Sequence, residues 1–246
     1  MPESLAITRL FNFLFGGIAA SAMHAVGIPA DPATAITNNF ALEMLVAAGL
    51  IVFFVVVRLT LSVENPNPLQ QTAELIHEGI GDQADQIIGH GYERFQAFVT
   101  CIFLFVLLNN LLGAIPGIPA PTTSPGVPLG LACLTFLFYN FQGIRAQGPV
   151  HYVKHFAGPV WWMAWLIFPI EIVSHLARIL SLTIRLYANM FASDLVTLVF
   201  FSLIPFAVPA IFLGLHVAVS VIQAFVFMLL AMIYLSLAVS HDSADI

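Results

Sequence analysis

The chain has 246 residues, of which 60% are hydrophobic and only 8% carry a formal charge. Soluble domains carry charges on about a quarter of their residues, so these proportions exclude an ordinary soluble globule and indicate an integral membrane protein. The net charge of -6 and the lack of a basic patch with interleaved aromatic residues exclude nucleic acid as an expected partner.

Residues 1–39 are expected to form an extracytoplasmic or interfacial segment. Residues 11–23 are moderately apolar, and the small residues at 20–22 loosely fit a signal-peptide cleavage site. The charged region that precedes a signal peptide is weak here, because Glu3 and Arg9 cancel. We therefore expect a short helix at the membrane interface rather than a cleaved signal peptide.

Five apolar segments follow, within a membrane domain predicted over residues 40–240. A bilayer core about 30 Å thick needs roughly 20 helical residues, and the last two segments are much longer than that. We therefore expect an all-α membrane protein whose last two helices form a long, steeply tilted hairpin. The predicted spans cover residues 40–61, 95–112, 128–143, 161–201 and 209–239, and residues 241–246 form a short tail.

Residues 69–90, between the first two spans, are amphipathic. Leu75 and Ile80 belong to a set of apolar residues at helical spacing, and Glu78 and Asp82 lie among them. Such a pattern predicts a helix that lies on the membrane surface, here on the cytoplasmic side.

Basic residues indicate how the chain is oriented in the membrane. Arg58 and Arg94 flank the predicted surface helix. Arg145 and Lys154 lie between the third and fourth spans, whereas residues 116–128 carry no charge. Basic loops favour the cytoplasmic side, so we expect the N-terminus outside and the C-terminus in the cytoplasm.

Formal charges inside the membrane are the most informative feature of the sequence. The region from the fourth span onward holds Glu171, Arg178, Arg185 and Asp194. Each costs on the order of 3 kcal/mol at the bilayer centre on insertion scales, so ionisable residues there mark ion or proton pathways by default. The alternative is that these residues pair with one another as purely structural contacts.

Helical geometry places most of these charges on one face. Glu171, Arg178 and Arg185 are spaced by seven residues, nearly two helical turns. His175 and Asn189 extend the same face by steps of four residues. A face that is polar over several turns cannot contact lipid, so it must contact another protein surface or a wet cavity.

The last span supplies a matching polar face. Counted from a turn near Pro205, Asp194 and His216 are both 11 residues away. Arg185 and Gln223 are 20 and 18 residues away, and equal counts in an antiparallel hairpin mean equal depth. We therefore expect Asp194 beside His216 toward the outside, and Arg185 level with Gln223 near the middle. The residues of this polar face are His216, Ser220 and Gln223.

Two plainer interpretations of the outer residues stay open at this point. Asp194 taken alone could be a charge at a helix end that contacts water. His216 taken alone could be a buried histidine whose hydrogen bonds are satisfied within the protein.

Two long motifs resemble a known family. The sequence FPIEIVSHLARILSLTIRLYANMFASD, followed by LHVAVSVIQAFVFMLLAMIYLSLAV, resembles subunit a of the F-type ATP synthase. The resemblance covers roughly residues 40–240. It implies a proton-conducting stator in the bacterial inner membrane, with a ring of c subunits and the peripheral-stalk b subunits as partners. It also implies that the chain binds no nucleotide and is not catalytic alone, and we expect no cofactor and no metal.

The resemblance implies roles for residues near the middle of the membrane. Arg185 matches the family's essential arginine, which faces the ion-binding carboxylate of the ring. Asn189 matches the asparagine that follows it, and Gln223 matches the glutamine of the last helix. Arg178 and Ser220 are expected to support these residues, Arg178 by contacting a neighbouring helix or Glu171.

The resemblance also implies roles toward the two membrane surfaces. Asp194 stands where many members have glutamate, and His216 where some have histidine; both belong to the half-channel open to the outside. Glu171 matches an acid near the cytoplasmic half-channel, and His175 is expected to act with it.

Two other classes of function were weighed. An independent ion channel or secondary transporter would be expected to show repeats and broken helices around a central site, whereas the polar face here is confined to one hairpin. An intramembrane protease is disfavoured because HEGIG, at residues 77–81, has Gly81 where a zinc site needs a second histidine.

Overall fold

The protein is described by a computed structural model that covers residues 6–25, 27, 31–32, 34–62, 65–115, 118–148, 164–203 and 207–239. Over these residues the secondary structure is helical, which confirms the all-α prediction. The helices long and apolar enough to cross a membrane are α2 (Asn38–Leu59), α4 (Glu93–Leu112), α5 (Gly126–Gln147), α7 (Ala164–Leu203) and α8 (Ala207–Val239). The others are α1 (Ala6–Ala25), α3 (Pro68–Ile88) and the 3-10 helix η1 (Pro121–Thr123).

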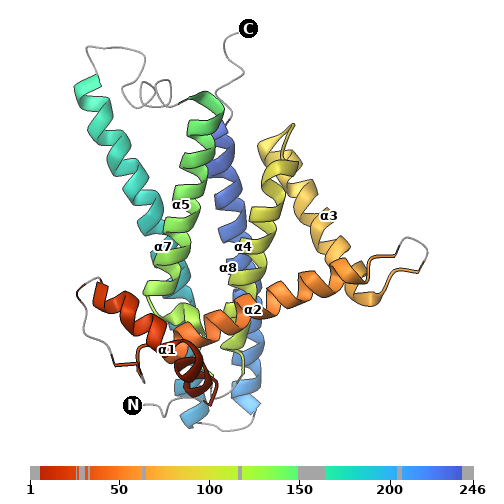
Figure 1. Cartoon of the computed structure of the whole chain (residues 1–246), viewed down its shortest axis with the longest axis vertical. Helices are drawn as coiled ribbons and strands as arrows, with labels where there is room; N and C mark the ends of the chain where they lie inside the picture. Colours follow the sequence, from red (N-terminus) through yellow and green to blue (C-terminus); the bar gives the residue numbers. More distant parts are fainter. Residues whose placement is uncertain are drawn as a thin grey trace.

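Helices α4, α5, α7 and α8 run roughly side by side, and α2 runs across them (Figure 1). With 40 and 33 residues, α7 and α8 are about 60 and 50 Å long, against a bilayer core of about 30 Å. Helices of that length must incline steeply to stay within the membrane. The 22 residues of α2 span about 33 Å, close to the thickness of the bilayer core, and α2 runs across the longer pair α7 and α8 (Figure 1).

The ends of α5 and α7 differ from the predicted spans. The third span was expected to end at Gly143, but the helix continues to Gln147 and stops before Gly148, whose φ of 80° leaves the helical region. The fourth span was expected from residue 161, whereas the described helix begins at Ala164. Lys154 and the expected turn at Pro205 lie outside the described residues.

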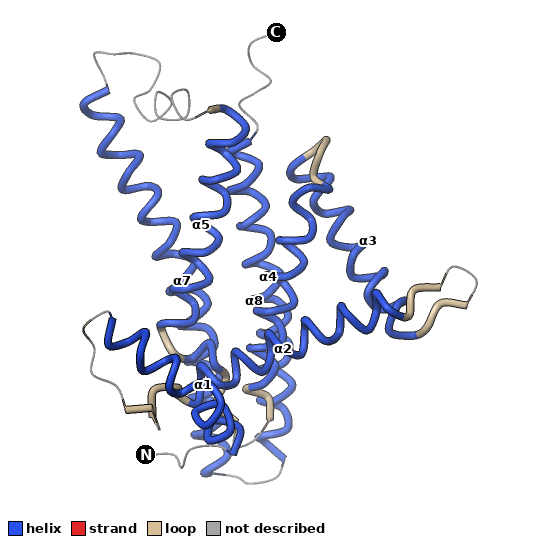
Figure 2. Tube along the Cα trace, viewed as in Figure 1, coloured by secondary structure: helices blue, strands red, loops and turns tan. Residues whose placement is uncertain are grey.

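The largest apolar core of the described residues joins α4, α5, α7 and α8, which Figure 2 shows as one bundle. Leu186 and Met190 of α7 are fully buried beside Ala224 and Phe227 of α8, and Val106 of α4 packs onto them. These side chains form a dry layer near the middle of the α7–α8 hairpin.

Helix α3 uses its apolar face against the rest of the protein. Ile80 and Ala84 are buried beside Met228 of α8, while Asp82 points outward and is exposed. Leu75 is 72% exposed and lies off this buried face. The amphipathic pattern predicted a membrane-surface helix, and the structure adds that its apolar side contacts α4 and α8.

Helix α1 is held against the segment that leads into α2. The side-chain amide of Asn12 donates to the carbonyl of Ile36 at 3.0 Å, and the N–H of Ile36 donates back to Asn12 Oδ1 at 2.9 Å. A Cβ at Gly16 would collide with the carbonyl oxygen of Pro32, so α1 needs a glycine at this close approach.

Candidate functional site

The structure gathers the predicted site residues into three groups along α7. The His216 cluster consists of Asn110, Ser193, Asp194 and His216. The arginine level consists of Ser181, Arg185, Asn189 and Gln223. The His175 cluster consists of Tyr139, Glu171, His175, Arg178 and Tyr234.

His216 is 1% exposed and contacts two other helices. Its Nε2 lies 3.2 Å from the backbone carbonyl oxygen of Asn110 on α4. Its Nδ1 lies 2.8 Å from Ser193 Oγ and 3.4 Å from Asp194 Oδ1. A carbonyl oxygen only accepts hydrogen bonds, so the tautomer with its proton on Nε2 suits these contacts, and Nδ1 then accepts from Ser193 Oγ. The predicted neighbours Asp194 and His216 are in contact, with Nδ1 on the side of the carboxylate.

The end of the bundle around His216 is polar inside. Thr122 of η1 donates to Asn110 Oδ1 at 2.8 Å, and both residues are fully buried. Asn109 Oδ1 and Asn110 Nδ2 are buried without a partner among the described residues. Buried polar atoms are nearly always hydrogen-bonded in proteins, so these two amide atoms are expected to bind water or a group outside the described residues.

The His175 cluster has a similar composition. His175 Nδ1 lies 3.0 Å from the hydroxyl of Tyr139, which is 2% exposed, and its Nε2 lies 3.4 Å from Glu171 Oε1. The guanidinium of Arg178 lies 5.3 Å from the ring centre of Tyr234 on α8. Of the two partners expected for Arg178, the structure thus shows the neighbouring helix.

At the arginine level, Gln223 is hydrogen-bonded to Asn189, which lies one turn from Arg185 on α7. Asn189 Nδ2 donates to Gln223 Oε1 at 2.6 Å, whereas Arg185 NH2 donates only to Ser181 Oγ at 3.4 Å. Among the described residues, no carboxylate lies within ion-pair distance of Arg185. Ser220, the other predicted supporting residue, is buried against Met190 Sδ at 4.0 Å. Arg185 is therefore a partly exposed cation without an acid in this part of its own chain.

Arg185 lies midway between the two histidine clusters. It follows His175 by ten residues and precedes Asp194 by nine, so each is about 14 to 15 Å away along α7. The buried side chains of Leu186 and Met190 fill the interior at this level. Within the described residues, hydrogen bonds form no chain from one cluster to the other.

The comparisons with known proteins bear on the whole chain. The family model described as ATP synthase A chain matches residues 41–236. The ATP synthase subunit a of Koribacter versatilis is 46% identical over 242 residues, which are 98% of this chain and 99% of that protein. The chain belongs to the ATP synthase subunit a family. The subunit a of Solibacter usitatus agrees, at 45% identity over 95% of this chain and 100% of its own length. Membership makes this chain a multi-pass membrane subunit of the ATP synthase complex.

Five residues of these groups in subunit a were not predicted from the sequence: Asn110, Tyr139, Ser181, Ser193 and Tyr234. Ser193 follows Asn189 by four residues, so the polar face itself could have indicated it. Tyr139 places a hydroxyl inside an apolar span, and Asn110 lies near the end of another apolar span. Both are weak indications of a functional residue. Spacing within one helix cannot show that α4 and α5 place these residues beside the α7–α8 hairpin.

Gly113 is predicted to be essential for the His216 cluster of subunit a. A Cβ at Gly113 would lie 2.7 Å from Ala120 Cβ and 3.0 Å from His216 Nε2. We expect Gly113→Ala to displace the His216 ring and to lower proton-driven ATP synthesis by roughly tenfold or more, because small misplacements of reacting groups cost such factors. ATP synthesis by reconstituted complexes measures the effect.

Gly79→Ala is the matched control for that variant. A Cβ at Gly79 meets no atom within 4 Å, and this residue lies on α3, outside the three groups. Equal synthesis rates for the two alanine variants would contradict the assigned role of Gly113.

Tyr139 is predicted to orient His175. We expect Tyr139→Phe to lower ATP-driven proton pumping a few-fold, because losing a hydrogen bond worth about 1 kcal/mol leaves the His175 ring less firmly oriented toward Glu171. The pair Tyr139→Phe and His175→Gln should be strongly non-additive, since the two side chains are bonded to each other. Additive losses, or an equal loss in the control Tyr92→Phe, would count against this coupling.

Proposed function

We propose that this chain is the proton-conducting stator subunit of a rotary ATP synthase. Two half-channels load and unload carboxylates on a ring of c subunits, which couples transmembrane proton flow to ring rotation and ATP synthesis. One observation carries the proposal. Two titratable clusters lie toward opposite ends of α7 with the cation of Arg185 midway, and no hydrogen bonds among the described residues connect them. A proton that passes from one cluster to the other therefore needs an external carrier.

The surface around Arg185 suits a helical partner. Only 11% of the most apolar stretch of α7 is buried within the chain, compared with 50% for α4. Ser181, Ala188 and Ala192 are exposed, small and close to Arg185 along α7. Small residues let two membrane helices approach closely, so a ring helix can bring its carboxylate to the guanidinium.

The proposed proton path follows from these contacts. A proton from the outside is taken up at Asp194 and His216 Nδ1, then neutralises a carboxylate on the ring. The neutral carboxylate can turn through lipid, where an ionised one would be costly. At Arg185 the guanidinium stabilises the ionised form, and the released proton leaves past Glu171 and His175. Arginine suits this task because it stays charged when partly desolvated.

The orientation is part of the proposal. Arg58, Arg94 and Arg145 lie at the ends of α2, α4 and α5 that we assign to the cytoplasm, which supports an external N-terminus and a cytoplasmic C-terminus. The peripheral-stalk b subunits and the c ring are the proposed protein partners. An independent channel would need the two clusters joined within the chain, so the stator is favoured over that alternative.

ATP synthesis by the complete complex in sodium-free vesicles tests the proposal. An imposed pH gradient should drive synthesis without sodium, and a protonophore should abolish it. Synthesis that requires sodium would contradict proton conduction. Purification of the intact complex without a ring of small subunits attached would contradict the stator assignment itself.

A further inference from the structure

A groove of about 720 Å³ lies between α2, α4 and α5. It is lined by none of the residues of the two histidine clusters or the arginine level. Its volume falls within the range of about 300–1,000 Å³ that is typical of small-molecule sites. The groove is therefore large enough for a ligand that the proton path does not account for.

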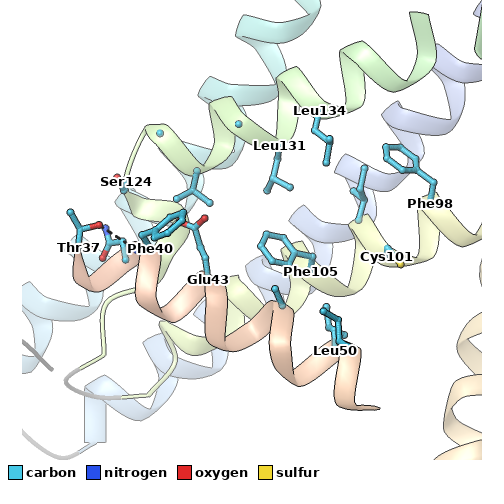
Figure 3. Close-up of a pocket in the computed structure, with 17 residues that line it drawn as sticks. Thr37, Phe40, Glu43, Leu50, Phe98, Cys101, Phe105, Ser124, Leu131 and Leu134 are labelled. Carbon is cyan, nitrogen blue, oxygen red and sulfur yellow. Dashed lines mark hydrogen bonds between the residues drawn. The ribbon is translucent and has the colours of Figure 1, made fainter. Parts of the chain in front are cut away.

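The two ends of the groove differ in chemistry. Thr37, Glu43 and Ser124 gather at one end (Figure 3). Leu50 and Leu134 belong to the apolar lining that extends away from them, together with Phe98, Phe105 and Leu131 (Figure 3). A polar end that continues into a long apolar lining matches an amphipathic ligand.

Glu43 is the formal charge in this groove. It is partly buried, and it forms no ion pair or hydrogen bond with the described residues. Arg58, the basic residue of the same helix, is 15 residues further on, or about 22 Å away. A carboxylate within a membrane helix normally has a cationic or hydrogen-bonding partner, so the partner of Glu43 is expected from outside this part of the chain.

The depth of the polar end agrees with a lipid headgroup. Thr37 caps the start of α2, the end at which a membrane-spanning helix meets the interface, and Glu43 lies about 9 Å further along the helix. A membrane helix of a partner protein would present mainly apolar side chains to Glu43, whereas a lipid headgroup presents charge and hydrogen-bond donors there.

We propose that this groove binds one phospholipid whose headgroup carries a primary ammonium, of the ethanolamine class. The ammonium donates charge-assisted hydrogen bonds to Glu43, which a quaternary choline cannot do because it has no N–H. The hydroxyls of Thr37 and Ser124 can donate to the phosphate, and the acyl chains lie along Leu50 and Leu134.

The test uses the complete ATP synthase complex, equilibrated with vesicles of equal ethanolamine and choline phospholipid and then exchanged into lipid-free detergent. Retained lipids are counted by mass spectrometry. The wild-type complex should retain about one more ethanolamine lipid than the Glu43→Gln complex. The affinity of the variant groove for this lipid should fall about tenfold, because a charge-assisted hydrogen bond is lost. Asp82→Asn, which removes an exposed carboxylate on α3, should retain as much as the wild type.

A second variant separates loss of the lipid from loss of the fold. A Cβ at Gly130 meets no atom within 4 Å, and this residue lines the groove within α5. Gly130→Leu should therefore fill the groove while it raises helix propensity. We expect an assembled complex that has lost the extra lipid. If Glu43→Gln and Gly130→Leu both retain it, the proposal is wrong.

Cys101 reports directly on occupancy, because it lines the groove and its side chain is exposed. In a Cys133→Ala background, N-ethylmaleimide should modify Cys101 several-fold more slowly in ethanolamine-lipid nanodiscs than in choline-lipid nanodiscs. Glu43→Gln should remove that difference. Equal rates in the two lipids for the parent protein would overturn the proposal, and strong protection in both would indicate a protein helix in the groove instead.

Discussion

Arg185→Ala is expected to abolish ATP synthesis coupled to proton flow. Arg185 is a partly exposed cation with Ser181 as its hydrogen-bond partner, so its charge is available to a carboxylate of another subunit. Removing about 3 kcal/mol of charge stabilisation within the membrane corresponds to a loss of roughly 100-fold or more. ATP-driven proton pumping into vesicles, measured by quenching of a pH-sensitive dye, gives the readout.

Arg178→Ala is the matched control for this variant. It removes the same charge from the same helix, two turns away, where the guanidinium lies over the ring of Tyr234. We expect a smaller loss than for Arg185→Ala, because the Arg178 cation contacts a neighbouring helix of its own chain, although its removal also alters the His175 cluster. Retained proton pumping by Arg185→Ala would refute the assigned role of Arg185.

Asp194 is expected to tolerate glutamate but not asparagine. Its carboxylate lies 3.4 Å from His216 Nδ1, so in the proposed path a proton passes between these two groups. An amide cannot take up that proton, and positioned acid–base groups contribute about 100-fold or more to proton transfer. Asp194→Asn should therefore prevent growth on a non-fermentable carbon source and lower ATP synthesis to a similar degree, whereas Asp194→Glu keeps a titratable group within reach.

The control for the Asp194 variants is Asp85→Asn. Asp85 is an exposed carboxylate on α3, so this change alters net charge equally but leaves the His216 cluster intact. Normal growth of the Asp194→Asn strain would show that Asp194 does not relay protons. Poor growth of both asparagine variants would attribute the effect to charge or assembly.

Some features of this protein follow from local rules alone. Apolar segments longer than a bilayer predicted the membrane class and the steep inclination of α7 and α8, because helix length is proportional to residue count. Steps of seven and four residues placed Glu171, His175 and Arg185 on one face. Counting from the turn also brought Asp194 to His216, since depth in a hairpin depends only on distance from its turn.

Other features depend on contacts between segments far apart in the chain, which periodicity does not encode. Asn110 reaches His216 across 106 positions, and Tyr139 reaches His175 across 36. Gln223 hydrogen-bonds to Asn189, a partner that counting from the turn does not specify, because depth alone does not fix side-chain direction. The crosswise course of α2, and the groove that it forms with α4 and α5, likewise arise from how whole helices pack, which no single segment specifies.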